Sequence, residues 1–140
     1  MGGRSYGSLA LFAATVAAGP VKRDYNTSMI YSFEDVPITS NLQYIPCFDN
    51  FSCTNLEVPL DYEHPEVGTT NIAFIKHAAS QQPAMGDIIF NPGGPGGSGV
   101  ADVLVLTDAL VALLGDTHNI VGMDPRGTYK AVFLHWMIQS

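Results

Sequence analysis

Positive charge is scarce in this sequence. Among its 140 residues, six are Lys or Arg and thirteen are Asp or Glu, so the formal net charge at pH 7 is −7. A chain this acidic repels phosphate backbones, and we therefore expect no nucleic-acid partner. The apolar share of 46% is high enough for a hydrophobic core, which excludes wholesale disorder.

Cysteine and histidine are also few, and neither is spaced like a set of metal ligands. The two cysteines, Cys47 and Cys53, enclose five residues. In an oxidising compartment, cysteines this close form a disulfide more readily than a metal site, and so small a loop stabilises the fold by about 2 kcal/mol. We expect this disulfide and neither a metal site nor a cofactor. The histidines are scattered, without a pair at i, i+4: His64, His77, His118 and His135.

No apolar run is long enough to span a bilayer, yet the sequence opens on a shorter one. Arg4 precedes an apolar stretch at residues 9–18 that ends in small residues, as a secretory signal peptide does. A short buried helix is the alternative interpretation, although Gly19-Pro20 ends the segment abruptly. Lys22-Arg23 then resembles a dibasic processing site. We expect residues 1–23 to be removed, no membrane span, and a secreted protein.

Two Asn-x-Ser/Thr sequons fit secretion. They begin at Asn26 and Asn50, and both lie in polar, loop-like surroundings. Because so short a pattern also arises by chance, each asparagine is a candidate for glycosylation rather than an assigned site.

An irregular arm is expected to lead into the domain. Residues 24–55 mix Pro, Asn, Ser and aromatic side chains without a clean period. Residues 56–62 then alternate like an edge strand, because Pro59 lacks the N–H that a central strand needs. A turn at 64–68 joins this strand to a second one at 70–77. The apolar residues expected to pin the arm are Ile30, Phe33, Tyr44 and Ile45.

A strand, a helix and another strand follow. Residues 88–90 form the short apolar run typical of a strand buried on both faces of a parallel sheet, and 119–123 form another. Between them, Ser98 can cap a helix that stops before Gly115. The pattern predicts a partial α/β domain over 56–128, with an incomplete sheet and a right-handed crossover. The helix is expected to pack on the sheet through Val103, Leu106, Leu110, Leu113 and Leu114.

The glycine-rich segment at residues 91–99 carries the strongest chemical signal. Its sequence, Asn-Pro-Gly-Gly-Pro-Gly-Gly-Ser-Gly, leaves backbone N–H groups free to bind a negative group at the end of a strand. A P-loop is disfavoured because its lysine is absent. A dinucleotide fingerprint fits the spacing of 94–99, but Pro95 stiffens the turn and the leader argues against NAD. The remaining interpretation is an oxyanion hole, where loss of one donor costs about 2.7 to 4 kcal/mol in the barrier.

Three motifs together resemble a known enzyme family. They are Cys-x-x-Leu-x-Val-Pro-Leu-Asp-Tyr at 53–62, the glycine-rich segment, and Asp-Pro-Arg-Gly-Thr at 124–128. In this order they look like the opening of the prolyl and tripeptidyl aminopeptidase-like α/β-hydrolases. The resemblance covers residues 47–128 and implies an eight-stranded sheet, a lid, and a Ser-Asp-His triad acting on peptide N-termini or small esters. By position, it places the oxyanion donor at Gly94, with Gly93 as the alternative.

The third motif contains a charged pair. We expect Asp124 and Arg126, next to Gly127, to order the turn after the last strand through hydrogen bonds from the Arg126 guanidinium or from the backbone to the carboxylate. A direct contact between Arg126 and a substrate is the alternative.

The catalytic residues of such an enzyme are missing. No Gly-x-Ser-x-Gly elbow follows the glycine-rich segment, and Ser98 precedes the helix, so we interpret it as a cap and not as a nucleophile. The family-like pattern breaks at Tyr129, and residues 129–140 form an unrelated apolar tail. We therefore predict a truncated serine hydrolase that is inactive as this chain. The alternative is a secreted non-catalytic module whose glycine-rich segment holds an anion or a peptide carboxylate.

Overall fold

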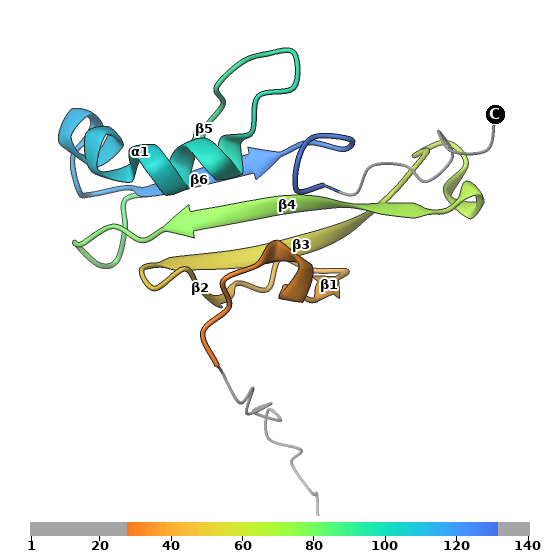
Figure 1. Ribbon diagram of the computed structural model, residues 1–140, viewed down its shortest axis with the longest axis horizontal. Helices are drawn as coiled ribbons and strands as arrows, with labels where there is room; N and C mark the ends of the chain where they lie inside the picture. The colour runs from red at the N-terminus through yellow and green to blue at the C-terminus, as the bar shows by residue number, and fades with distance from the viewer. Residues whose placement is uncertain (1–27, 132–140) are drawn as a thin grey trace, which may run out of the picture.

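The computed structural model describes residues 28–131, which form one mixed sheet with a helix packed on it (Figure 1). The predicted leader, the sequon at Asn26 and most of the predicted tail lie outside the described residues. The strands are β1 (Ile38–Thr39), β2 (Ile45–Cys47), β3 (Phe51–Pro59), β4 (Thr69–His77), β5 (Asp87–Phe90) and β6 (Asn119–Asp124). Their order in the sheet is β1-β3-β4-β6-β5, and β2 also pairs with β3. The helices are η1 (Phe33–Asp35), η2 (Pro65–Val67) and α1 (Gly99–Leu114).

The longest strands, β3 and β4, form an antiparallel hairpin. Their register runs from Phe51 opposite His77 to Pro59 opposite Thr69. The second predicted strand, at 70–77, is confirmed within one residue.

The edge strand predicted over residues 56–62 is confirmed only in part. β3 begins earlier, at Phe51, and its first half pairs with β4 on one side and with β1 and β2 on the other, whereas residues 57–59 pair within the described residues with β4 alone. Two buried polar residues, Thr54 and Asn55, break the apolar alternation and conceal the first half of the strand from sequence analysis. Pro59 is tolerated because it is the last residue of the strand, where few ladder hydrogen bonds remain.

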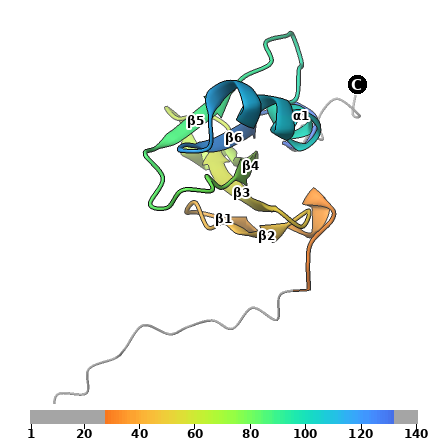
Figure 2. The ribbon, with the colours of Figure 1, turned by 90° about the vertical axis from the view of Figure 1, so that its left-hand side faces the viewer.

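The strand–helix–strand unit forms as predicted, because β5 and β6 are parallel neighbours joined through α1. Figure 2 shows α1 on one side of the sheet, and it packs against β6 and β4. The expectation that β5 is buried on both faces is wrong, since the Ile89 side chain is 63% exposed. β5 is the outermost strand of the sheet, and within the described residues no element covers the face opposite α1 at this strand.

The packed face of α1 differs from the predicted one. Val103 and Leu110 are buried, but Leu106 is exposed and the exposed fraction of Leu113 reaches 79%. The helix is apolar on nearly every side, so spacing alone could not identify the face that meets the sheet. The buried residues of the helix are Gly99, Val100, Val103, Thr107 and Leu110.

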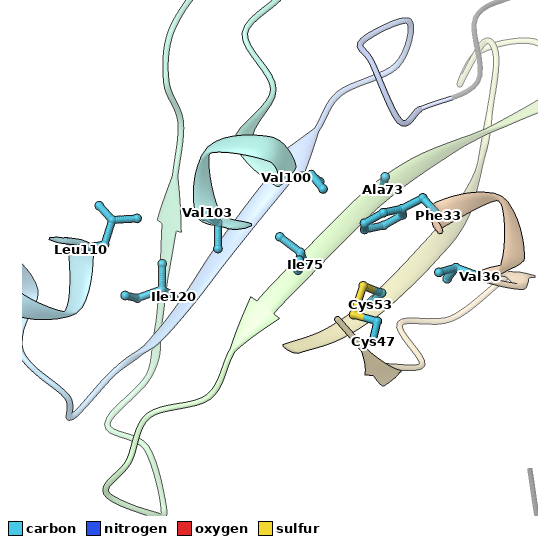
Figure 3. Close-up of a cluster of buried hydrophobic side chains, with 10 residues drawn as sticks. All are labelled: Phe33, Val36, Cys47, Cys53, Ala73, Ile75, Val100, Val103, Leu110 and Ile120. Atoms are coloured by element: carbon cyan, nitrogen blue, oxygen red, sulfur yellow. A yellow bond between two sulfur atoms is a disulfide. The ribbon is translucent and has the colours of Figure 1, made fainter. Parts of the chain in front are cut away.

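One core holds the helix, the sheet and the N-terminal arm together (Figure 3). Phe33 and Val36 bring the arm into this core, which confirms Phe33 as a pinning residue. The predicted disulfide between Cys47 and Cys53 is formed, with an S–S distance of 2.00 Å, and both residues are fully buried. Side chains of the core are Phe33, Val36, Cys47, Cys53, Ala73, Ile75, Val100, Val103, Leu110 and Ile120. Within residues 28–131, no helix has the length and apolarity needed to cross a membrane.

Candidate functional site

The glycine-rich segment connects the end of β5 to the start of α1 and is exposed to solvent. Residues 91–97 are all exposed, so the segment is open to a ligand from outside. The Asn91 side chain folds back, and its Oδ1 accepts a hydrogen bond from the Gly93 N–H at 3.0 Å. Gly93 has a φ of 81°, a conformation that favours glycine. The peptide bond between Gly94 and Pro95 is cis.

Gly94 differs from Gly93 in the state of its backbone donor. The Gly93 N–H is already bonded to Asn91, whereas within the described residues the Gly94 N–H donates to no acceptor. Gly94 is also confined, because a Cβ built there would lie 2.8 Å from the Gly96 nitrogen. A free and exposed N–H in a tightly constrained turn is the geometry that an oxyanion donor needs. The two glycines therefore differ in whether the backbone N–H is already bonded, and the assignment of Gly94 as the oxyanion donor stays a prediction.

Ser98 fixes the far end of this segment to the helix. Its Oγ accepts a hydrogen bond from the Ala101 N–H at 2.9 Å, which is an N-cap interaction. The same hydroxyl donates to the two carboxylate oxygens of Asp124, at 2.8 and 3.0 Å. The structure thus confirms that Ser98 is a cap.

Asp124 ties together the helix start, the last strand and the chain beyond it. Its carboxylate is fully buried and accepts hydrogen bonds from Ser98, from the Val100 N–H at 3.1 Å and from the Lys130 N–H at 3.1 Å. No basic side chain in the described residues forms an ion pair with it. The N-terminus of α1 supplies compensating positive charge instead, since the Val100 N–H donates to the carboxylate at the positive end of the helix dipole.

Arg126 does not pair with Asp124, which corrects one part of the predicted turn. Its guanidinium instead donates to the carbonyl oxygens of Pro59 and Leu60, at 3.1 and 2.9 Å. It also lies 5.3 Å from the centre of the Tyr62 ring. Arg126 therefore fastens the end of the β3–β4 hairpin to the turn after β6. The backbone part of the prediction is confirmed by the bond from Lys130 to Asp124.

A small cavity of about 180 Å³ lies beside this contact. Its lining residues are Leu60, Thr70, Arg126 and Gly127. Two carbonyls and a ring already engage the guanidinium, so the geometry supports the structural role of Arg126 more than a direct substrate contact.

A larger cavity of about 290 Å³ was not foreseen from the sequence. Its polar wall contains Asn55 and Asn71, which are both buried and joined by a hydrogen bond of 3.2 Å. Asn55 also donates to the backbone carbonyls of Phe33 and Val36, so this pair anchors the arm to the sheet. The sequence carries little signal for this pair, because Asn55 lies just before the first predicted hairpin strand and only Asn71 lies within a predicted strand.

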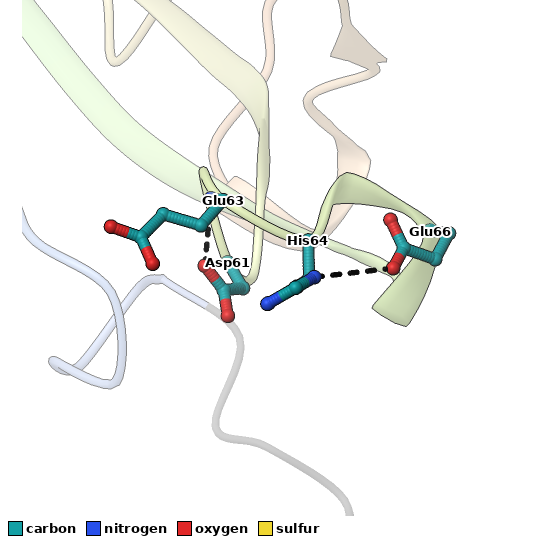
Figure 4. A network of polar contacts seen from close by, with 4 residues as sticks. All are labelled: Asp61, Glu63, His64 and Glu66. Carbon is teal, nitrogen blue, oxygen red and sulfur yellow. Dashed lines mark hydrogen bonds and ion pairs between the residues drawn. The ribbon is translucent and has the colours of Figure 1, made fainter.

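The charged groups of the β3–β4 turn form local contacts only (Figure 4). Asp61 accepts a hydrogen bond from the Glu63 N–H at 2.8 Å, and His64 Nδ1 lies 3.4 Å from a carboxylate oxygen of Glu66. Both partners of the second contact are exposed. Within residues 28–131, no three His, Cys, Asp or Glu side chains are grouped so as to hold a metal ion.

The described residues contain no Gly-x-Ser-x-Gly elbow, and so no nucleophilic serine of that kind lies near the glycine-rich segment. One Gly-x-Ser-x-Gly pattern does occur, at residues 3–7, but it lies in the predicted leader and ahead of the glycine-rich segment. The chain order of α/β-hydrolases places the nucleophile after that segment.

Comparison with known proteins identifies hydrolases. The chain is 36% identical over 75 residues to serine protease Hip1 of Mycobacterium tuberculosis, and 37% identical over 76 residues to its carboxylesterase B. It is 35% identical over 79 residues to the tripeptidyl aminopeptidase of Streptomyces lividans. Each match covers 54% of this chain but only 14% to 15% of the relative. No protein-family model matches.

These relatives confirm the resemblance predicted from the three motifs and the fold class that it implied. A mixed sheet with one crossover helix is the part of an α/β-hydrolase fold that the described residues contain. The chain is therefore similar, over about half of its length, to a short part of several hydrolases.

Proposed function

We propose that this chain is the oxyanion-loop region of a secreted serine hydrolase whose complete form cleaves peptide N-terminal bonds or related esters and amides. The observation that carries the proposal is the free, exposed N–H of Gly94 in the segment between β5 and α1. The relatives named serine protease, carboxylesterase and tripeptidyl aminopeptidase support this reaction class. The buried disulfide supports an oxidising, secretory destination.

The chemistry assigned to Gly94 is the stabilisation of negative charge. When a nucleophile attacks a carbonyl, its oxygen becomes an oxyanion, and a donor fixed in advance binds that oxygen more strongly than the ground-state carbonyl. In α/β-hydrolases, this donor acts together with the N–H that follows the nucleophile. Asp124 and Ser98 contribute by fixing the end of the segment against α1.

The 140-residue chain by itself should not turn over substrate. It lacks a Gly-x-Ser-x-Gly elbow after the glycine-rich segment, and therefore the serine whose attack would generate the oxyanion. Even in a complete protease fold, an oxyanion hole and substrate binding without a working triad leave only about 10³- to 10⁴-fold acceleration over water, far below that of the intact enzyme.

A stand-alone binding module that holds an anion on the same segment is the other candidate. Its difficulty is the amount of apolar surface, since Val105 is 81% exposed and other large apolar side chains of α1 are exposed beside it. A soluble monomer rarely leaves such a patch uncovered. The hydrolase-region proposal fits this surface better.

The direct test is turnover of a chromogenic proline or alanine anilide by the folded chain. Circular dichroism on the same sample would establish that the sheet and the helix are present. We expect folded protein without turnover. Turnover that survives removal of the leader would contradict the proposed inactivity and would require a nucleophile among residues 24–140.

A further inference from the structure

The turn between β2 and β3 carries a sequon that the proposed hydrolase function does not use. Cys47 pairs with Phe51, so Phe48, Asp49 and Asn50 form the tip of the hairpin. Asn50 is exposed, and its backbone N–H donates to the Phe48 carbonyl at 2.8 Å. Within the described residues, the side-chain amide of Asn50 makes no hydrogen bond. Its attachment atom is therefore accessible.

The position of this turn leaves the candidate site open. Phe51 pairs with His77, and His77 pairs with Ile120 near the start of β6. β5 and β6 both run from this end of the sheet towards the glycine-rich segment. A large group on Asn50 would thus project from the end opposite Gly94 and would not cover it.

The folded turn is nevertheless a poor acceptor for a modifying enzyme. An Asn-x-Ser transferase must reach both the asparagine amide and the serine hydroxyl. Ser52 is half-buried in β3 and is paired on both sides, with Pro46 and with Lys76. The Cys47–Cys53 disulfide closes the hairpin around the sequon, so the segment cannot straighten once that bond exists.

We propose that Asn50 carries an N-linked glycan and that the glycan is added before the Cys47–Cys53 disulfide closes. The secretory leader and the disulfide place the chain in the compartment where both events occur. Disulfide formation takes seconds to hours, which leaves time for the transfer.

The test uses the full chain secreted from yeast behind an added yeast leader, so that neither the native leader nor any activity is assayed. Asn26→Gln in every version removes the other sequon. Intact mass before and after peptide N-glycosidase treatment should show a glycan on the parent and none on Asn50→Gln or Ser52→Ala. Asn41→Gln, at an exposed asparagine outside any sequon, should keep the glycan.

The order of events is tested by replacing both cysteines. The Cys47→Ser/Cys53→Ser variant should carry the glycan on at least as large a fraction of molecules as the parent. A secreted parent with unmodified Asn50 would overturn the site. A clear drop in occupancy without the disulfide would overturn the order, because the closed turn would then be the preferred acceptor.

Discussion

Asp124 is the residue on which the geometry of the candidate site depends most. It receives hydrogen bonds from two segments, the start of α1 through Ser98 and Val100 and the chain after β6 through Lys130, and the Ser98 hydroxyl also caps α1 directly after the glycine-rich segment. The carboxylate is fully buried, so each lost bond leaves a group without solvent to replace it.

Asp124→Asn should therefore destabilise the fold by about 2 to 3 kcal/mol, the cost of losing a hydrogen bond to a buried charge. The asparagine oxygen can still accept from the N–H of Val100 or from that of Lys130, but not from both, because the NH2 group that replaces the other oxygen only donates. Urea unfolding, at a concentration where the chain is monomeric, measures the change. Asp108→Asn is the matched control, because Asp108 is an exposed aspartate on α1. Equal midpoints for the two variants would contradict the role given to Asp124.

Tyr44 provides a second prediction, on pH. Burial raises the pKa of its hydroxyl, and the nearby negative charge of Asp87 raises that pKa further. The folded state therefore holds this proton more tightly than the unfolded state, so stability is complete below about pH 10 and falls as the pH rises above that value. Tyr44→Phe should flatten this alkaline loss of stability while keeping the ring that lies 3.9 Å from the Lys76 ammonium.

The measurement for Tyr44 is the free energy of unfolding as a function of pH between 9 and 11. Tyr62→Phe, at an exposed tyrosine, controls for the loss of a hydroxyl as such. If the free energy of unfolding fell equally steeply with pH in the parent and in Tyr44→Phe, Tyr44 would not be the source of the alkaline loss of stability.

At the scale of elements, α1 and β6 approach each other through two glycines. A Cβ on Gly99 would lie 2.7 Å from the Met123 carbonyl oxygen, and one on Gly122 would overlap the Gly99 backbone. Gly122→Ala should therefore push the helix away from the strand and cost roughly 1 to 3 kcal/mol, as overpacking of a core does. Gly86→Ala is a weaker control, with its nearest atom at 3.8 Å but a φ of 157°. A thermal midpoint for Gly122→Ala as high as for the parent would refute the close contact.

The elements with a strong local pattern could be predicted from the sequence, and those set by tertiary context could not. The second hairpin strand, the capped helix and the parallel pair each showed a regular apolar pattern or were bounded by residues typical of caps and turns. β1 and β2 are too short to show a period, and the first half of β3 contains Thr54 and Asn55, which are buried through hydrogen bonding and packing rather than through apolarity. The packed side of α1 was uncertain for the opposite reason, since apolar residues surround it.

In the candidate site, too, local features could be predicted from the sequence and tertiary contacts could not. The location of the glycine-rich segment and the cap at Ser98 are local properties and were predictable. The partner of Arg126 was not, because Pro59 and Leu60 are distant in sequence and offer backbone carbonyls, which carry no sequence signal. The free N–H of Gly94 likewise depends on where Asn91 directs its side chain.

At the scale of the whole molecule, apolar surface remains uncovered on both sides of the sheet. Val105 and Leu113 project from the outer side of α1, and Ile89 is exposed on β5. We expect the chain to self-associate as its concentration rises, which sedimentation velocity would detect. Val105→Lys/Leu113→Lys should shift the population towards monomer. Ser40→Lys/Thr69→Lys adds the same charge at exposed polar positions and should not.

A parent chain that stays monomeric at high concentration would contradict this expectation. It would also favour the stand-alone binding module over the hydrolase region, because a module must be stable without further protein to cover α1.

The central claim is that Gly94 donates its N–H to an oxyanion, and a chimera tests it most directly. The segment of the Streptomyces lividans tripeptidyl aminopeptidase that matches this chain would be replaced by the residues of this chain, and kcat would be measured on a chromogenic tripeptide substrate. The chimera should be active. Gly94→Ala keeps the N–H but places a Cβ 2.8 Å from the Gly96 nitrogen, so it should displace the donor and lower kcat by up to about 10²- to 10³-fold. Gly115→Ala, which strains a glycine with a φ of 82° at the helix end, should lower stability but not kcat. Equal kcat for the chimera with and without Gly94→Ala would contradict the account.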